Sequence, residues 1–341
     1  MGLAELGAMR DYDLHNFINH YLGDDPSTNP YVNSSYGGYA DLSSLTVGHG
    51  SSLAPLFLSL NVQSLNSKYL SLKDLVNGLT KENINLNAIA LQEVWNIPHP
   101  DLLKIDNYQL FLNQRSNSRG GGVGFYIREG LSAKVVKNLS PLYEGILECL
   151  TVELFIANKK IFLTSFYRPP TNDASKIDLF LTKFDELLEL LHRNNSTYLL
   201  FGDANINLLK ISHCPLSQKY LNTIHSNGFI NGIFKATRIQ GPSYSLIDHI
   251  LVKNEPTKTT FKTVICDISD HFITSVTWET TKAKRIQKTV QSRNFNYQTM
   301  SEFQNTLNGL DWNLVYSCND SNTAFNIFLI YLWTSLISIF Q

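Results

Sequence analysis

Cysteine is scarce in this sequence of 341 residues, which contains only four. Cys149, Cys214, Cys266 and Cys318 lie far apart and form no C-x-x-C pair. That spacing argues against a zinc ribbon, and a chain of this length does not need a disulfide scaffold. The cysteines therefore point to neither of these protein classes.

An excess of charge of either sign is also absent, because 28 Lys and Arg face 29 Asp and Glu. This balance excludes histone-like binding of nucleic acid by bulk positive charge. It is compatible with a local basic groove, or with phosphate bound through a metal ion. Apolar residues make up 43% and charged residues 17%, so the chain can bury a sizeable core. The length predicts two domains, or one large domain with appendages.

Several targeting and nucleotide-binding motifs are missing. The first 30 residues contain no basic segment followed by an apolar run, and Leu6 breaks the N-myristoylation pattern that Met1 and Gly2 begin. We therefore expect a reducing compartment, the nucleus or the cytoplasm. No G-x-x-x-x-G-K-[ST] motif occurs, so the glycine-rich stretch 120–124 is expected to be a turn into a strand. Neither G-x-S-x-G nor H-E-x-x-H is present.

Composition divides the chain into three segments. Residues 1–54 are rich in turn-forming residues and lack apolar periodicity, which predicts a poorly structured leader. Residues 55–279 alternate strand and helix patterns and are expected to form the domain. Residues 280–341 read as a basic linker and an apolar helical tail. Polar residues interrupt that tail, which favours a helix packed on a partner over a membrane span.

The domain is expected to have mixed sheets packed between helices, an α/β fold of the α+β mixed-sheet kind, because several predicted strands follow each other without a helix. The longest helix is predicted from Ala174 to Arg193, where apolar residues recur every three or four positions. Further helices are expected around 72–79 and 217–226. Strands are predicted at 56–61, 88–91, 123–127, 147–156, 161–166, 197–201, 246–252 and 273–278.

Polar side chains recur at the ends of these apolar strands. Each has an ordinary structural explanation, such as a turn cap or a buried histidine with a partner. Their recurrence indicates a site, because strand ends hold side chains rigidly at the rim of a sheet. Carboxylates with asparagine favour Mg²⁺ or Mn²⁺ over zinc, and an Asp–His pair suits hydrolysis of a phosphoester. The residues are Asn61, Glu93, Tyr167, Asp203, Asn205, Asp248, Asp270 and His271.

Seven motifs in order closely resemble the endonuclease/exonuclease/phosphatase superfamily, and most of all the apurinic-type endonuclease domain of non-LTR (LINE-type) retrotransposons. The resemblance covers about residues 55–279. Each motif is weak alone, but the full set in this order is specific. The motifs are Asn61–Leu65 (NVQSL), Leu91–Trp95 (LQEVW), Gly121–Phe125 (GGVGF), Tyr167–Pro170 (YRPP), Gly202–Asn207 (GDANIN), Ser245–His249 (SLIDH) and Ser269–His271 (SDH).

The resemblance implies a four-layer α/β sandwich with its active site at one rim of two sheets. It implies Mg²⁺, which Mn²⁺ can replace, held by Glu93 and Asn61 with support from Asp270. Asp203 would activate the attacking water, and Asn205 would hydrogen-bond the phosphate or the water. His271, held in place by Asp248, would contact the phosphate and stabilise its developing charge, and Tyr167 would also contact the phosphate. Ser245 and Ile247 would lie on a hairpin that faces DNA.

Two departures from the family pattern stand out. Ala204 occupies the position of an aromatic residue in the usual GDFN motif, which is expected to loosen packing beneath the catalytic loop. The 63 residues after Trp278 are too few for the reverse transcriptase that follows this domain in the family. The tail resembles the start of the spacer to that enzyme, so reverse transcriptase or element RNA would be partners in trans.

The leading hypothesis is a metal-dependent endonuclease that nicks one strand of double-stranded DNA and leaves a 3′-hydroxyl, as in target-primed retrotransposition. A second hypothesis keeps the superfamily but changes the substrate, to abasic-site repair or to a phosphatase. A third is a catalytically decayed fragment that binds nucleic acid. The presence of every candidate catalytic residue argues against decay.

Overall fold

The computed structural model describes residues 36–40, 54–278 and 297–339, apart from residues 85, 117, 157–158, 193–195, 242 and 257–258. The chain divides into two compact units, Met1–Thr281 and Lys282–Gln341. The predicted basic linker lies outside the described residues.

The first unit contains a mixed sheet. In it β2 (Leu56–Asn61) and β3 (Leu86–Gln92) run parallel to each other, whereas β16 (Ile273–Trp278), β5 (Val123–Arg128) and β4 (Tyr108–Asn113) run antiparallel to their neighbours. The apolar runs predicted at 56–61, 123–127 and 273–278 are central strands, buried along nearly their whole length. In spatial order the strands are β1 (Tyr36–Ala40), β15 (Thr259–Val264), β16 (Ile273–Trp278), β2 (Leu56–Asn61), β3 (Leu86–Gln92), β5 (Val123–Arg128) and β4 (Tyr108–Asn113).

A second sheet faces the first, and its centre is the parallel pair of β9 and β10. A separate hairpin of β12 (Arg238–Gln240) and β13 (Ser243–Ser245) stands beside it. In spatial order the strands are β11 (Ile230–Asn231), β14 (Asp248–Lys253), β10 (Thr197–Asp203), β9 (Lys159–Tyr167), β8 (Leu147–Ile156) and β6 (Ala133–Val135), with β7 (Leu142–Tyr143) also on β8.

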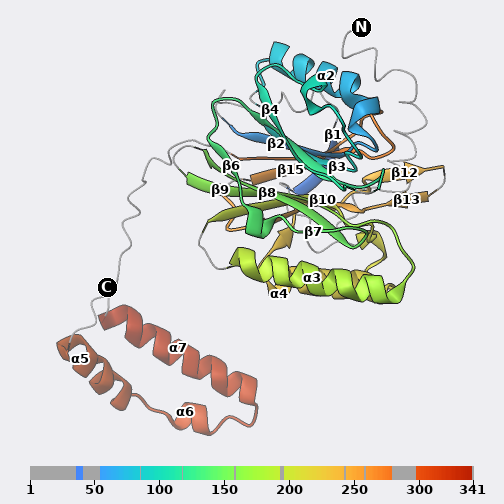
Figure 1. Cartoon of the computed structure of the whole chain (residues 1–341). Helices are drawn as coiled ribbons and strands as arrows, with labels where there is room; N and C mark the ends of the chain where they lie inside the picture. Colours follow the sequence, from blue (N-terminus) through green and yellow to red (C-terminus); the bar gives the residue numbers. More distant parts are fainter. Residues whose placement is uncertain are drawn as a thin grey trace. The chain divides into compact units, whose positions relative to one another are not determined.

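Helices cover the outer faces of both sheets, which confirms the predicted four layers. The helix α2 (Leu65–Lys81) lies on the side of the first sheet, and α3 (Ala174–His192) and α4 (Pro215–Ser226) lie on the side of the second (Figure 1). Short 3₁₀ helices lie in the loops, at Pro100–Leu102, Lys137–Leu139 and Leu208–Lys210.

The alternation of side chains along β2 decides which residue reaches the site. Leu58 belongs to the apolar cluster with Leu75 of α2, whereas Phe57 lies in the core between the sheets, 6.4 Å from the ring of Phe201. Successive side chains of a strand point to opposite faces. Asn61, four residues after Phe57, therefore points toward the second sheet.

Several elements depart from the sequence predictions. Tyr36–Ala40 form β1 in parallel with β15, so this part of the expected leader belongs to the sheet. The helix expected around 72–79 begins earlier, at Leu65, and β14 begins at Asp248 rather than at 246. The strands β4, β6, β7, β12, β13 and β15 were not predicted, because they are short or mix polar with apolar residues.

The second unit is helical in the residues that the structure describes. It contains α5 (Tyr297–Asn308), α6 (Asn313–Tyr316) and α7 (Ser321–Ile339), and α7 packs against both of the others. Trp312 lies 5.7 Å from the ring of Tyr331 on α7. Among the described residues, no helix is long and apolar enough to cross a bilayer.

We predict that β1 stabilises the first unit, because it pairs the edge of β15 that would otherwise carry open backbone groups. A fragment of residues 36–281 should exceed one of residues 41–281 in free energy of unfolding by about 1–2 kcal/mol, the net value of one or two hydrogen bonds. Urea denaturation of both fragments measures this difference. Equal midpoints would show that β1 adds nothing in solution.

Candidate active site

Strand register places a row of polar side chains across the rim of the second sheet. Glu148 pairs with Tyr167 between β8 and β9, and Tyr167 pairs with Asp203 between β9 and β10. Asp203 in turn pairs with Asp248 on β14. Residues directly opposite each other on neighbouring strands share one face of a sheet. Asn61 reaches the same rim from the end of β2, so both sheets contribute to the site.

Asp203 is the buried centre of this row, with 1% of its surface exposed. One carboxylate oxygen accepts the backbone N–H of Asn205 at 2.8 Å, and the other accepts Nδ2 of Asn61 at 2.9 Å. Burial, and then the charge of Asp248, raise the pKa of Asp203 to about 7, although His271 and the hydrogen bonds act to lower it. A carboxylate with a pKa near neutrality is suited to accept a proton.

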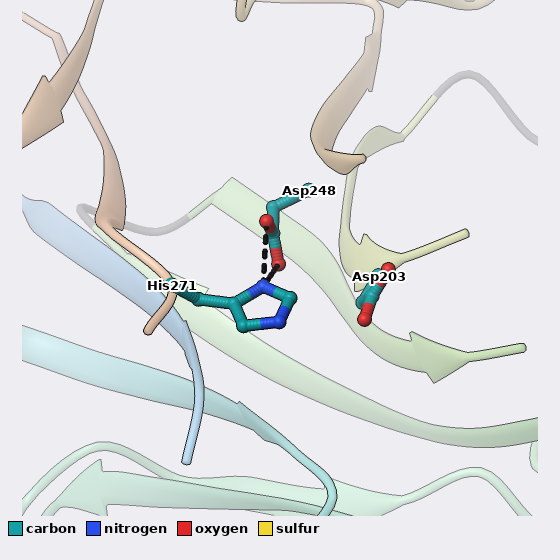
Figure 2. A group of neighbouring side chains, drawn as sticks. All are labelled: Asp203, Asp248 and His271. Carbon is teal, nitrogen blue, oxygen red and sulfur yellow. Dashed lines mark hydrogen bonds and ion pairs between the residues drawn. The ribbon is translucent and has the colours of Figure 1, made fainter. Parts of the chain in front are cut away.

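Asp248 and His271 form a buried ion pair. Nδ1 of His271 lies 3.0 and 2.9 Å from the two carboxylate oxygens of Asp248, and Asp203 lies beside the pair (Figure 2). The hydroxyl of Thr237 donates a 2.6 Å hydrogen bond to Asp248. Burial lowers the pKa of His271, but the charges of Asp248, Asp203 and Asp270 raise it to about 9. The imidazole is therefore a cation at neutral pH, able to stabilise negative charge on a phosphate.

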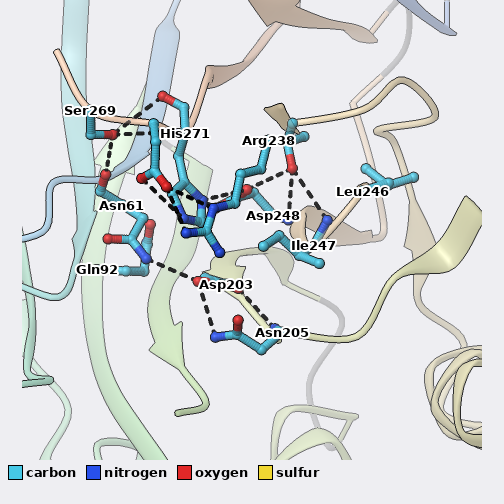
Figure 3. A network of polar contacts seen from close by, with 12 residues as sticks. Asn61, Gln92, Asp203, Asn205, Arg238, Leu246, Ile247, Asp248, Ser269 and His271 are labelled. Atoms are coloured by element: carbon cyan, nitrogen blue, oxygen red, sulfur yellow. Dashed lines mark hydrogen bonds and ion pairs between the residues drawn. The ribbon is translucent and has the colours of Figure 1, made fainter. Parts of the chain in front are cut away.

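Asn61 links the two carboxylates on either side of the rim. Its Nδ2 donates to Asp203 (Figure 3) and also to Oε1 of Glu93 at 2.8 Å. The other oxygen of Glu93 accepts Nε1 of Trp95 at 3.2 Å, and the hydroxyl of Tyr167 also hydrogen-bonds Glu93. Burial and the nearby charges of Glu93 and Asp203 raise the pKa of Tyr167, so it stays a neutral donor. The carboxylate of Glu93 is thereby held in one orientation.

Asp270 lies next to His271 and is paired with Arg238 of the hairpin. Nε and Nη2 of Arg238 donate to one oxygen of Asp270 at 2.8 and 2.6 Å. The other oxygen is buried, has no hydrogen-bond partner and lies 3.8 Å from Nε2 of His271. Ser269 secures this loop to the first sheet through a 2.7 Å hydrogen bond to the carbonyl of Asn61.

Asn205 occupies a tight turn that a buried arginine supports. Its φ is 49°, and its Nδ2 donates to the carbonyl of Arg168 at 2.8 Å. Nη1 of Arg168 donates to the carbonyls of Ala204 and Asn205 at 2.9 and 3.3 Å, and its guanidinium lies 5.3 Å from the ring centre of Phe180. The loop that carries Asp203 is therefore held from below by a cation.

Glu93 and Asp270 each offer a carboxylate oxygen, the kind of ligand that a hard divalent cation prefers. Glu93 is half-exposed, and Asp270 keeps a buried oxygen without a hydrogen bond. The cluster of Asp203, Asp248 and His271, whose atoms lie within 4.8 Å of one another, fits a metal less well, because a protonated imidazole has no free lone pair. Asn61 presents its nitrogen to the carboxylates, while its oxygen accepts a backbone N–H. Its role as a metal ligand stays a prediction.

Of the two residues expected to face DNA, Ser245 belongs to the hairpin and Ile247 follows it. Ser245 ends β13 and is half-buried, whereas Ile247 is only 6% exposed. The carbonyl of Ile247 accepts the N–H of Ala204 at 3.0 Å, so Ile247 supports the catalytic loop. Contact of either residue with DNA stays a prediction.

Sequence reasoning missed several residues that shape the site. Thr237 and Arg238 hold Asp248 and Asp270, but the three-residue strand β12 shows no apolar pattern that could reveal it. Arg168 did have a signal, because it follows Tyr167 directly. Glu148 is fully buried against the guanidinium of Arg115, and only its register across β9 shows that it belongs to the row.

Comparison with known families and structures shows what the chain is similar to. The profile of the endonuclease/exonuclease/phosphatase family matches residues 58–271. The chain belongs to this family. Its members are typically hydrolases that act on phosphodiester bonds and generally use divalent metals. A search of curated proteins returned no significant match.

Three solved structures are similar to this chain at low sequence identity. The endonuclease domain of TRAS1, a telomere-specific non-LTR retrotransposon, is 13% identical, with a TM-score of 0.50 over 66% of this chain and 98% of that one. A D. rerio TDP2 complexed with a single strand DNA product is 16% identical, with a TM-score of 0.46 over 67% and 99%. The human Nocturnin catalytic domain is 10% identical, with a TM-score of 0.48 over 66% and 93%.

His249 follows Asp248 but belongs to the core rather than to the catalytic group. It is fully buried, and Nδ1 lies 3.1 Å from the hydroxyl of Tyr220 while Nε2 lies 3.3 Å from the carbonyl of Leu246. Burial lowers its pKa to about 4, so it is neutral in the folded protein.

This histidine predicts a loss of stability in mild acid. The unfolded chain binds a proton at His249 below pH 6.5 and the folded chain does not until about pH 4, so stability is complete above 6.5 and falls below it. The advantage of wild type over His249→Gln in free energy of unfolding should shrink by about 2 kcal/mol between pH 7.5 and pH 5. Urea denaturation at the two pH values tests this, and a constant difference would contradict it.

Proposed function

We propose that this chain is a divalent-metal-dependent DNA endonuclease that nicks one strand and leaves a 3′-hydroxyl, as in target-primed retrotransposition. The observation that carries the proposal is the single rim where Asn61 joins Glu93 to Asp203 beside the Asp248–His271 pair. It combines a proton acceptor, a cation for phosphate and an oxygen-rich metal site. The seven sequence motifs favour DNA over other phosphoesters.

In this mechanism Asp203 accepts the proton of a water molecule as its oxygen attacks phosphorus. The backbone N–H of Asn205 and the amide of Asn61 fix the carboxylate in place, which leaves it one productive orientation. Nδ2 of Asn205 lies 3.2 Å from the same carboxylate, next to the position that water would take.

His271 and Tyr167 serve the phosphate. The imidazolium, charged through Asp248, donates Nε2–H toward a non-bridging oxygen and stabilises the charge that develops there. The hydroxyl of Tyr167, a neutral donor that hydrogen-bonds Glu93 in this structure, would turn its one O–H to the phosphate when substrate binds. A divalent cation at Glu93, with Asp270 and Asn61, would neutralise charge on the phosphate and on the departing 3′-oxygen. Water thus breaks the bond between phosphorus and the 3′-oxygen, which leaves a 5′-phosphate and a 3′-hydroxyl.

The proposal extends to partners and place. Double-stranded DNA is the substrate, and element RNA or a reverse transcriptase acting in trans would use the 3′-hydroxyl. A nuclear or cytoplasmic location fits both. Repair of abasic sites, phosphatase activity and a decayed binding fragment are the competing outcomes of the test.

The decisive test is nicking of supercoiled plasmid by the full chain. We expect nicks with Mg²⁺ or Mn²⁺, none in EDTA, and ends that a DNA polymerase extends, because the nick carries a 3′-hydroxyl. Cleavage restricted to abasic DNA would favour a repair nuclease, and release of phosphate alone would favour a phosphatase. DNA binding with no cleavage of any substrate would indicate decay, and full activity in EDTA would contradict the metal site.

Asp203→Asn separates catalysis from capping. Loss of the proton acceptor should lower the nicking rate roughly 10²- to 10⁴-fold, while DNA affinity stays equal or rises because one negative charge is gone. Asp320→Asn is the matched control, since Asp320 accepts the N–H of Thr323 at 2.8 Å in a pure capping role. Asn caps about as well as Asp, so the control should keep full activity. An Asp203→Asn rate within about threefold of wild type would remove Asp203 from the mechanism.

His271 and Asp248 should behave as one catalytic unit. The charge of His271 depends on Asp248, so once either is lost the other has little left to contribute. The double variant His271→Ala/Asp248→Asn is expected to nick only slightly more slowly than the worse single variant. Single-turnover rates of the three variants test this, and rate losses that multiply would show independent action.

A further inference from the structure

The Glu93 side of the rim is built from two segments joined by backbone hydrogen bonds. The segment 94–96 follows the proposed metal ligand, and the segment 119–122 leads into β5. Their bonds run from Val94 N–H to the Gly122 carbonyl at 3.2 Å, from Trp95 N–H to the Gly121 carbonyl at 2.8 Å, and from Asn96 N–H to the Arg119 carbonyl at 3.1 Å.

This junction depends on unusual backbone geometry, which holds Arg119 against the segment that follows Glu93. Glu93 and Trp95 have φ values of 53° and 60°, and Gly122 has 79°. A Cβ added at Gly122 would lie 2.9 Å from Cγ2 of Val94, so only glycine lets the two segments approach. The backbone of Arg119 is therefore held in place by the fold and is not part of a free loop.

The side chain of Arg119 is presented to solvent on an aromatic support. Its guanidinium lies 5.3 Å from the ring centre of Trp95, whose Nε1 donates to Glu93 at 3.2 Å. Arg119 is exposed and makes no side-chain hydrogen bond or ion pair with any residue that the structure describes. A guanidinium over the face of an aromatic ring can still donate its N–H groups, because they point outward in the plane of the guanidinium itself.

Other arginines near the site are already engaged. Arg115 pairs with the buried Glu148, Arg238 pairs with Asp270, and Arg168 donates to carbonyls beneath the catalytic loop. The stretch 113–122 carries two arginines and no carboxylate, next to a rim rich in carboxylates. A polyanion approaching that rim meets repulsion that an unpaired cation at its edge would offset.

We propose that Arg119, held on Trp95, binds a backbone phosphate of DNA flanking the one that is cleaved. This inference rests on the proposed DNA endonuclease function. The bound group is a phosphodiester, which guanidinium N–H groups recognise by paired hydrogen bonds. Arg119 thereby aligns the strand along the Glu93 side without taking part in the chemical step.

The test compares Arg119→Gln and Arg119→Lys with wild type in the full chain. Binding of a 20-base-pair DNA duplex is measured by fluorescence anisotropy in EDTA across a salt series, and kcat and KM for nicking are measured in Mg²⁺. Lys134→Gln is the matched control, because Lys134 is exposed on β6 opposite Glu153, five positions along β8 from the rim residue Glu148. Lys134→Gln also removes one positive charge, but at a position along the sheet away from the catalytic rim.

We expect Arg119→Gln to weaken DNA binding about 3- to 10-fold and to reduce the salt slope of log K by about 0.9, the value of one phosphate contact. KM should rise with kcat within twofold, and Arg119→Lys should recover part of the affinity. Lys134→Gln should leave all of these unchanged.

Three results would overturn the proposal: an affinity and salt slope for Arg119→Gln equal to those of Lys134→Gln, a fall in kcat with unchanged affinity, or no recovery by lysine. Urea denaturation of each variant tests whether it is folded. If Arg119→Gln is not folded, the comparison is made between Arg119→Lys and wild type. If wild type neither binds nor nicks DNA, the proposed function fails instead, which is a separate outcome.

Discussion

The amide of Asn61 is the contact on which the site depends, because it joins the rims of the two sheets. It is the last residue of a strand in the first sheet, and it donates to Asp203 at the end of a strand in the second. The same nitrogen donates to Glu93, so Asn61 fixes the distance between Glu93, the proposed metal ligand, and Asp203, the proposed proton acceptor. A shift of one sheet along the other would break both contacts. The packing of the core between the sheets is therefore also what holds the catalytic geometry.

The burial of so many charges is tolerated because each has a partner. Asp248 faces the imidazolium of His271, Asp270 faces Arg238, and Glu148 faces Arg115. An unpaired buried charge costs several kcal/mol, so removal of a single partner is more damaging than loss of the pair. Asp203 differs, because neutral amides and a backbone N–H surround it. Burial and the charge of Asp248 raise the pKa of Asp203 to about 7, and the hydrogen bonds from these groups only partly offset that rise, so Asp203 is the member of the rim that can exchange a proton.

The sequence predicted most of the fold, and it marked several polar residues that the structure brings together at one rim. Long apolar runs such as 147–156 became strands with the predicted bounds, because burial on both faces leaves a strong pattern. The short strand β12 left none, and Tyr36–Ala40 lay in a stretch that looked like a leader. The motifs marked Asp203, Asp248 and His271 as a set, and the structure brings them within 4.8 Å.

What the sequence determined by itself was the local part: strand periodicity, the polar residues at strand ends and the order of the motifs that indicates the family. Tertiary structure alone decided the partners. Nothing in the sequence places Thr237 on Asp248, Arg238 on Asp270 or Glu148 in the row with Tyr167, because these contacts depend on the register in which strands pair and on how loops pack in the folded chain. The pKa of Asp203 belongs to the same class, since it arises from burial and from neighbours that only folding brings together.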